Sequence, residues 1–339
     1  MFKKSIFIDT FFSFCYNLDK IGVCFMGIVV LLLIFIISVS PVTFFAYKIY
    51  VKDFDKEPTK ILVKLFLCGV GSTFVTLLIT YMLNSFFPFF SSEYTDLNII
   101  TLIPYVFLGV AAIEEFSKWI FVYKLEYNDN EFNHLYDGIV YAAFVSLGFA
   151  CFENILYVFN FGISTGIVRA ITAIPGHLCD GIIMGYFLSM AKLSMCNHNK
   201  KLARKNIFLS LLAPIIAHGI YDYTIMASQL SGYDFFFYLF IIFIVVFFSY
   251  CSSKVKLLAD NTYNLNPNYI SINDRKKIQQ AINQQTVNNI NNYNGQYNIN
   301  NQFNIPEQVV NNMNNQYNNT EQSMNVQNNY FEHNINDVH

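Results

Sequence analysis

The sequence "VAAIEEFSKWIF", from Val110 to Phe121, places two adjacent glutamates and a lysine inside an apolar segment. The length and hydrophobicity of the surrounding residues otherwise predict a membrane-spanning helix. A charged side chain at the centre of a bilayer costs about 2.5–3.5 kcal/mol on membrane-insertion scales. A segment that served only as an anchor would gain nothing from Glu114, Glu115 and Lys118. We therefore interpret these three side chains as functional.

The composition indicates a membrane protein. Of the 339 residues, 54% are hydrophobic and only 13% are charged, whereas a soluble domain carries roughly 25% charged residues. The formal net charge is −2 and no basic stripe is present, so nucleic acid is not an expected partner. Seven cysteines are scattered without a CxxC or CxxH spacing, which argues against a disulfide framework and against a thiolate zinc site.

Apolar runs near the roughly 20 residues that cross a bilayer occur seven times along the chain. They cover about 24–47, 61–83, 101–123, 138–159, 168–190, 207–228 and 234–251. We therefore predict an all-α polytopic protein of the cell membrane, with about seven transmembrane helices and the lipid bilayer as its surroundings.

The loops between these runs alternate in charge. Residues 48–60 and 191–206 are rich in lysine, whereas residues 84–100, 160–167 and 229–233 contain neither Lys nor Arg. Because positively charged loops remain on the cytoplasmic side, this alternation predicts a cytoplasmic C-terminus.

Three parts of the chain are expected. Residues 1–23 form an N-terminal segment, for which an interfacial helix is one interpretation. Residues 24–258 form the transmembrane domain. Residues 259–339 are dominated by Asn and Gln, in runs such as "NNINNYNGQYNINNQFN". A low-complexity polar segment of this kind has no apolar face to bury, so we predict a disordered tail.

Charged and imidazole side chains interrupt four successive spans. In the third span, Glu114 and Lys118 are four residues apart, so we expect them to share one helix face and to neutralise each other. Glu115 points about 100° away from Glu114 in an α-helix. One lysine is therefore not expected to satisfy both glutamates.

The next three spans carry the other polar groups. The fourth contains Glu153, the fifth contains His177, and the sixth contains His218 and Asp222, which share a face. With about 1.5 Å of rise per residue, Glu114, His177 and His218 can meet in one layer, whereas Glu153 lies nearer the outer surface. Ionisable residues inside a membrane are functional by default. The sequence therefore predicts a polar site within the bilayer.

Imidazoles and carboxylates in a hydrated pocket suit the activation of water. A buried glutamate can act as a general base, and a histidine can donate to a developing oxyanion or bind a metal. The sequence contains no HExxH motif. The residues alone leave a hydrolase and an ion-coupled carrier as open alternatives.

Four motifs add a resemblance. "EEFSK", "FACFEN", "IPGHLCDGIIMGY" and "HGIYD" follow one another on successive spans. In that order they resemble the PrsW family of intramembrane proteases, within the wider group of type II CAAX prenyl proteases and bacteriocin-immunity proteins. The resemblance covers about residues 45–250. The wider group has FxxxH at the second motif, where this chain has Glu153.

The resemblance implies an endopeptidase that cleaves a membrane-anchored protein, which in the founding bacterial case is an anti-sigma factor. It implies that Glu114 or Glu115 activates water. His218 would orient the water or stabilise the oxyanion, with Asp222 holding its tautomer.

In the same interpretation, His177 and Glu153 complete the pocket, with Lys118 and Asn154 in support. No cofactor is certain, and zinc bound through His177 and His218 stays open. Two alternatives remain beside the protease: a non-enzymatic peptide-binding or immunity protein on the same scaffold, and an ion-coupled transporter.

Overall fold

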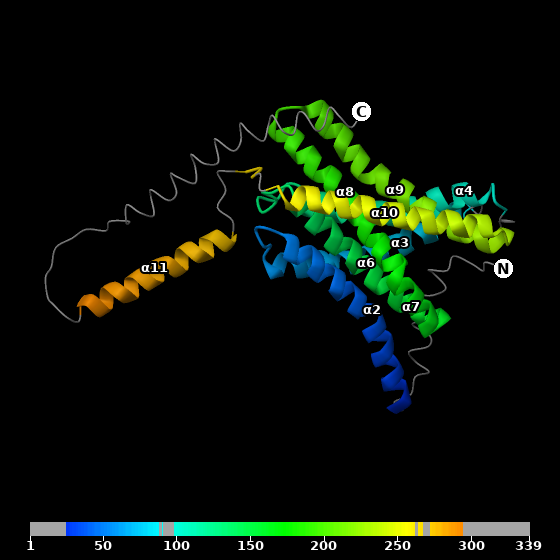
Figure 1. Ribbon diagram of the computed structural model, residues 1–339, viewed down its shortest axis with the longest axis horizontal. Coiled ribbons are helices and arrows are strands. Elements are labelled where there is room, and N and C mark those ends of the chain that lie inside the picture. Colours follow the sequence, from blue (N-terminus) through cyan, green and yellow to red (C-terminus); the bar gives the residue numbers. More distant parts are fainter. Residues whose placement is uncertain (1–24, 88–89, 91–97, 262–263, 267–271, 294–339) are drawn as a thin grey trace. The chain divides into compact units, whose positions relative to one another are not determined.

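The computed structural model describes residues 25–87, 90, 98–261, 264–266 and 272–293 (Figure 1). The predicted N-terminal segment and most of the Asn-rich tail lie outside these residues. The chain divides into two units, with the boundary between Asp274 and Arg275.

The first unit is helical in its described parts, as the sequence predicts. Its long helices are α2 (Phe25–Lys52), α3 (Thr59–Phe86), α6 (Asp137–Phe161), α8 (Ala173–Cys196), α9 (Lys200–Ser231) and α10 (Asp234–Ala259). Among the described residues, six helical stretches are long and apolar enough to cross a membrane. The prediction of an all-α polytopic membrane protein is therefore confirmed.

The third predicted span is not one continuous α-helix. Its residues form three consecutive pieces: α4 (Leu102–Pro104), a π-helix η2 (Tyr105–Ala111) and α5 (Ala112–Leu125). None of these pieces alone has the length of a span, which explains why six long helices accompany seven predicted spans. π-Helical turns occur frequently at functional sites, and this one directly precedes the two glutamates.

The fifth predicted span also has an interruption. A short amphipathic helix α7 (Ile163–Ile171) ends at Thr172, whose φ of −121° and ψ of −67° depart from helical values, and α8 begins at Ala173. Arg169 therefore lies on α7, whereas His177 lies on α8. The direction of the Arg169 side chain relative to His177 is set by this break and not by one continuous helix face.

Helix α6 occupies the centre of the unit. In its most apolar stretch 89% of residues are buried inside the protein, compared with 17% for α10. It packs against α2, α3 and α8, and α8 packs in turn against α9 (Figure 1). Glycines permit the close approach: a Cβ atom at Gly185 of α8 would clash with the backbone of Gly138 on α6.

The turn between α2 and α3 lies outside the spans and buries two carboxylates. Asp53 and Glu57 are 4% and 5% exposed. The ammonium group of Lys56 donates to the carbonyl oxygens of Tyr50 and Val51 at 2.6 and 2.9 Å, which satisfies the end of α2. Burial raises the pKa of Asp53 to about 7, and burial, assisted by neighbouring carboxylates, raises the pKa of Glu57 to about 10.

The second unit is described only through helix α11 (Ile272–Tyr293), whose first three residues precede the boundary. All of its residues fall within the segment 259–339, which the sequence predicts to be a disordered low-complexity tail. The side chains described in this helix are almost all exposed, as its polar sequence requires. The disorder predicted for residues 294–339 concerns residues outside those described.

Candidate functional site

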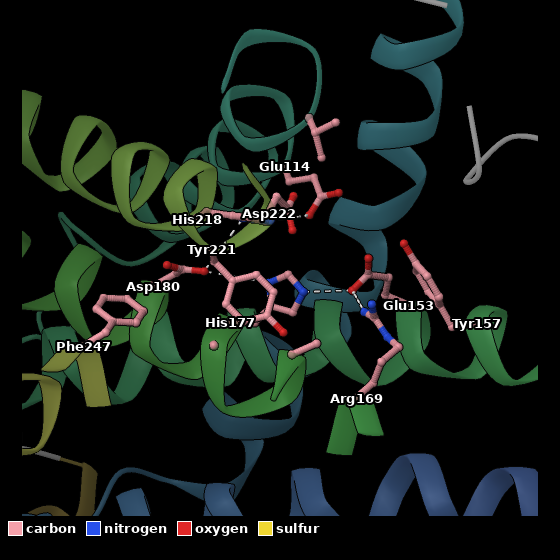
Figure 2. Close-up of a pocket in the computed structure, with 13 residues that line it drawn as sticks. Glu114, Glu153, Tyr157, Arg169, His177, Asp180, His218, Tyr221, Asp222 and Phe247 are labelled. Atoms are coloured by element: carbon pink, nitrogen blue, oxygen red, sulfur yellow. Dashed lines mark hydrogen bonds and ion pairs between the residues drawn. The ribbon is translucent and has the colours of Figure 1, made fainter. Parts of the chain in front are cut away.

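The predicted polar residues gather around one cavity of about 60 Å³ inside the helical unit (Figure 2). Its ionisable lining comes from α5, α6, α7, α8 and α9: Glu114, Glu153, Arg169, His177, Asp180, His218 and Asp222. A cavity of this size has room for a few water molecules. It is far below the roughly 300–1,000 Å³ of pockets that hold small-molecule ligands.

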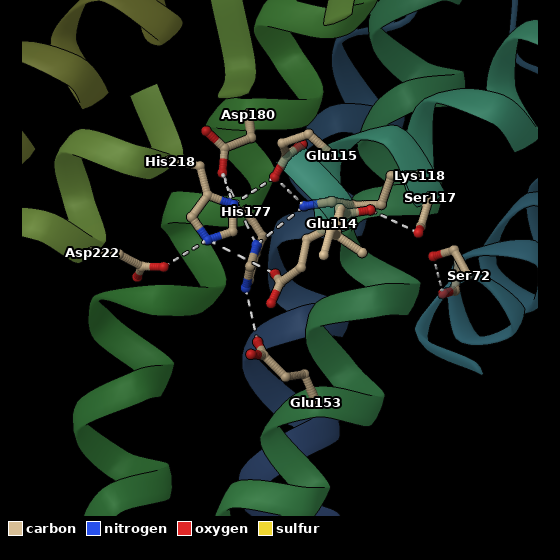
Figure 3. A network of polar contacts seen from close by, with 12 residues as sticks. Ser72, Glu114, Glu115, Ser117, Lys118, Glu153, His177, Asp180, His218 and Asp222 are labelled. Atoms are coloured by element: carbon tan, nitrogen blue, oxygen red, sulfur yellow. Dashed lines mark hydrogen bonds and ion pairs between the residues drawn. The ribbon is translucent and has the colours of Figure 1, made fainter. Parts of the chain in front are cut away.

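The buried ion pair of the site joins Glu115 and Lys118. Lys118 Nζ lies 2.5 Å from Glu115 Oε1 and 3.3 Å from His177 Nδ1 (Figure 3). Both members of the pair are 0% exposed. The expectation that Lys118 pairs with Glu114 is therefore wrong: the closest carboxylate is three residues away, because the lysine turns toward α8 and His177.

Glu115 also holds the second histidine. His218 Nδ1 lies 2.6 Å from Glu115 Oε1, and His218 Nε2 lies 3.3 Å from Asp222 Oδ2. Both ring nitrogens therefore face carboxylate oxygens, which accept hydrogen bonds, so both nitrogens are placed to donate. The sequence analysis gave Asp222 alone the role of orienting the His218 ring. In the structure Glu115 shares this role and is the nearer partner.

Glu114 differs from its neighbour in what its side chain faces. It lines the cavity, which Glu115 does not. The Oε2 atoms of both glutamates are buried without a hydrogen-bond partner, but that of Glu114 lies 3.8 Å from His218 Nε2. Of the two adjacent carboxylates, Glu114 therefore presents a free oxygen to the cavity, facing an imidazole nitrogen.

Glu153 links α6, α7 and α8. Its Oε2 atom lies 2.8 Å from His177 Nε2 and also accepts a hydrogen bond from Arg169 Nη2 (Figure 2). The guanidinium group of Arg169 stacks over the ring of Tyr157, 3.6 Å from its centroid. The depth estimate placed Glu153 outside the histidine layer, but helix rise alone omits the arrangement of α7 and α8 that brings these partners together.

Two charged residues among those that line the cavity were not predicted as site residues. Asp180 is 3% exposed, and its Oδ2 atom lies 3.8 Å from His218 Nδ1 and 4.0 Å from His177 Nδ1. The available signal was its position three residues after His177, on the same helix face. Arg169 is the other, and its signal was a guanidinium group within an apolar run.

Asn154 follows Glu153 in the sequence but points elsewhere. Its Nδ2 atom lies 3.4 Å from Ser38 Oγ, and the side chain is fully buried between α6 and α2. It does not line the cavity. The structure thus places Asn154 at the contact between α6 and α2. Its side chain does not point toward the cavity residues that it was expected to support.

Two sets of donors have the residue types and spacing that could hold a metal ion. One comprises Glu115, His177, Asp180 and His218, and the other comprises Glu114, Glu153 and His177. Within each set the donor atoms lie within 4.8 Å of one another. Imidazole and carboxylate are ligands that zinc accepts.

The arrangement can activate water. Because Glu114 Oε2 and His218 Nε2 are 3.8 Å apart, a single water molecule can hydrogen-bond to both. A carboxylate on one side and a nitrogen donor on the other are the two groups needed to remove a proton and to stabilise negative charge on oxygen.

Comparison with known proteins agrees with this chemistry. Residues 57–250 match a family described as "PrsW family intramembrane metalloprotease". A Protease PrsW of Oceanobacillus iheyensis is 33% identical over 225 residues, covering 66% of this chain and 95% of that protein. The Protease PrsW of Geobacillus kaustophilus is 36% identical over 185 residues, covering 54% and 76%, and that of Bacillus subtilis is 35% identical over 179 residues, covering 52% and 76%. No solved structure matches the chain.

Proposed function

Because this chain belongs to the PrsW family and is therefore an intramembrane protease, we propose that Glu114 is the general base that activates water in the cavity. The free Oε2 atom of Glu114, facing His218 Nε2 at 3.8 Å, is the observation that carries this assignment. The sequence left Glu114 and Glu115 as equal candidates. Their different surroundings favour Glu114.

Glu115 has a different task in this proposal. One of its oxygens is engaged by both Lys118 and His218, at 2.5 and 2.6 Å. A carboxylate held by two donors is a poorer proton acceptor than a free one, because removing a proton from water would compete with both hydrogen bonds. Glu115 is therefore a positioning residue that fixes the ring of His218.

The proposed reaction is the hydrolysis of a peptide bond. Glu114 takes a proton from a water molecule while the water oxygen bonds to the carbonyl carbon of the substrate. His218 Nε2 donates to the oxygen that becomes negatively charged. The proton held by Glu114 then passes to the leaving nitrogen as the carbon–nitrogen bond breaks, which yields a carboxylic acid and an amine.

The second histidine completes the wall of the cavity. His177 is held from both sides, by Lys118 at Nδ1 and by Glu153 at Nε2. Asp180 lies between the two imidazoles and Asp222 contacts His218. These groups keep the rings fixed, and preorganised donors stabilise a transition state better than mobile ones.

The substrate class follows from the location of the site. The site lies among helices that are long and apolar enough to cross a membrane, where a chain anchored in the same membrane would be found, so we infer a membrane-anchored protein as the substrate. An anti-sigma factor is the narrower hypothesis, carried over from the family resemblance. The lysine-rich loops at 48–60 and 191–206 support a cytoplasmic location for the C-terminal tail.

The decisive experiment compares two single variants with the unmodified protein. Glu114→Gln is expected to abolish cleavage while membrane insertion and thermal stability remain close to normal. A comparison of membrane proteomes should then show single-span proteins that accumulate in the variant. Asp234→Asn, a change of an exposed carboxylate at the start of α10, is the matched control and should cleave normally.

Two outcomes would contradict the proposal. Normal cleavage by Glu114→Gln would remove Glu114 as the base. If Glu115→Gln alone lost cleavage without losing stability, the roles of the two glutamates would have to be exchanged.

A further inference from the structure

We propose that Lys118 and Arg169 are the resident cations of the site, occupying the places that a divalent metal ion would need, so that this protease binds no catalytic zinc. The inference rests on the proposal that the cavity is the place of reaction. It departs from the word "metalloprotease" in the description of the matching family. The evidence for it is the contacts that Lys118 and Arg169 make in the two donor sets described above, the four-residue set of Glu115, His177, Asp180 and His218 and the three-residue set of Glu114, Glu153 and His177.

In the four-residue set, an ammonium group already lies among the donors. Lys118 Nζ is within hydrogen-bond distance of two of them, Glu115 Oε1 at 2.5 Å and His177 Nδ1 at 3.3 Å. A zinc ion would have to bond to the same two atoms at about 2.0–2.2 Å. The ammonium group and the ion cannot both occupy this space, and their like charges repel strongly where water is excluded.

Lys118 is held in place by its surroundings. The side chain is fully buried, and its ammonium group lies 4.7 Å from the centroid of the Phe149 ring. Moving it aside for a metal ion would break its ion pair with Glu115 and its contact with His177, which is unfavourable for a fully buried charge. Lys118 is thus a fixed part of the site.

The spacing of the donors also suits hydrogen bonds better than metal coordination. Glu115 Oε1 and His218 Nδ1 are 2.6 Å apart. Two ligands of one tetrahedral zinc ion, each about 2.0–2.1 Å from the metal, are separated by roughly 3.3 Å. The observed pair shares a proton at a distance too short for shared coordination.

The three-residue set shows the same pattern around a guanidinium group. Glu153 Oε2 lies 2.8 Å from His177 Nε2, again a hydrogen-bond distance, and the same oxygen accepts from Arg169. A guanidinium group is always charged and has no lone pair to offer a metal. An ion bound to Glu114, Glu153 and His177 would have to displace Arg169 from the carboxylate.

Together the two basic side chains supply positive charge on both sides of His177. Glu115 and Glu153 therefore each have a counter-charge that belongs to the chain, at the oxygen atoms that a metal ion would need.

The test measures metal content and affinity, independently of cleavage. The full-length protein, purified in detergent, is expected to contain only traces of zinc and to show no change in Tm when zinc is added. Lys118→Met removes the ammonium group while keeping an unbranched side chain, and should expose the four-donor set. This variant is expected to bind zinc at least roughly tenfold more tightly than the unmodified protein, with a zinc-dependent rise in Tm.

Two controls accompany that variant. Lys124→Met changes an exposed lysine on the same helix and should gain no zinc affinity. Adding His177→Ala to Lys118→Met should abolish the gain, because one donor is lost. If Lys118→Met does not fold, the zinc content and zinc titration of the unmodified protein decide the question by themselves.

Stoichiometric zinc in the unmodified protein, lost in His177→Ala or His218→Ala, would overturn the inference. A folded Lys118→Met variant without any gain in zinc affinity would overturn the assignment of Lys118. This test is separate from the assignment of Glu114 as the base. If the protein contains no zinc but Glu114→Gln is active, only the proposed base is refuted. If the protein contains stoichiometric zinc and Glu114→Gln is inactive, only the proposal that Lys118 and Arg169 replace the metal is refuted.

Discussion

Glu115 and Lys118, three residues apart on α5, form an ion pair in which neither side chain has any exposed surface and the charged atoms are 2.5 Å apart. Lys118 then reaches His177 and Glu115 reaches His218, so one pair connects α5 to α8 and α9. The two imidazole rings stand 5.2 Å apart, centroid to centroid. Their relative position depends on this pair.

The first prediction concerns the stability of that pair. Glu115→Gln and Lys118→Met should each destabilise the protein by about 3–5 kcal/mol, because each leaves one buried charge without its partner. The double variant should lose much less than the sum of the two, since neither charge remains. Thermal or denaturant unfolding in detergent measures the effect. Additive losses in the double variant would show that the two side chains do not act as a pair.

The second prediction concerns Arg169, a positioning residue that acts through Glu153 on His177. Arg169→Gln should lower kcat by roughly 10–100-fold with little change in KM, because a small displacement of a catalytic group is costly to the rate. Arg169→Lys should restore part of the activity, since lysine keeps the charge but loses the planar fork. Arg204→Gln, at an exposed arginine of α9, is the control. Equal activities of the Gln and Lys variants would contradict a role that depends on charge.

The third prediction concerns the close contact of α6 and α8. Gly185→Ala would place a methyl group against the backbone of Gly138 and Ile139, so the helices must separate. A loss of about 1–3 kcal/mol is expected from overpacking, together with reduced cleavage, since α8 carries His177. Gly71→Ala on α3 is the matched control, because its nearest neighbour, the ring of Phe121, would lie 3.9 Å away. Similar unfolding temperatures for the two variants would be evidence against the tight contact.

The fourth prediction concerns pH and the turn between α2 and α3. The folded state raises the pKa of Asp53 to about 7 and that of Glu57 to about 10, so it holds protons more firmly than the unfolded chain. Stability should therefore fall as pH rises, between about 4 and 7 for Asp53 and from about 4.5 upward for Glu57.

Glu57→Gln should flatten this dependence and raise stability at pH 8 by on the order of 1–3 kcal/mol. Unfolding temperatures at pH 5.5 and pH 8 provide the measurement. Asp234→Asn, at an exposed position, should leave the slope unchanged. An unchanged slope in both Glu57→Gln and Asp53→Asn would show that these carboxylates do not control the pH dependence.

The sequence by itself determined the class of the protein and most of the ionisable residues that meet at the cavity. Hydrophobic runs of membrane-spanning length predicted the long helices, because burying backbone polar groups in lipid requires helical hydrogen bonding. Charges that are costly at bilayer depth marked Glu114, Glu115, Glu153, His177 and His218. All five lie at or directly beside the cavity, and the family resemblance is confirmed by the comparisons.

Only the tertiary structure decided how those residues are paired. Helical spacing tells which side chains share a face, but a lysine has several carboxylates within reach, and the packing of α8 turned Lys118 toward Glu115 and His177. The π-helix before α5 and the break at Thr172 change the rotation of the residues that follow, which a regular 3.6-residue repeat cannot anticipate. Which carboxylate lines the cavity, and which one pairs with Lys118, therefore depends on contacts between helices that are distant in the sequence.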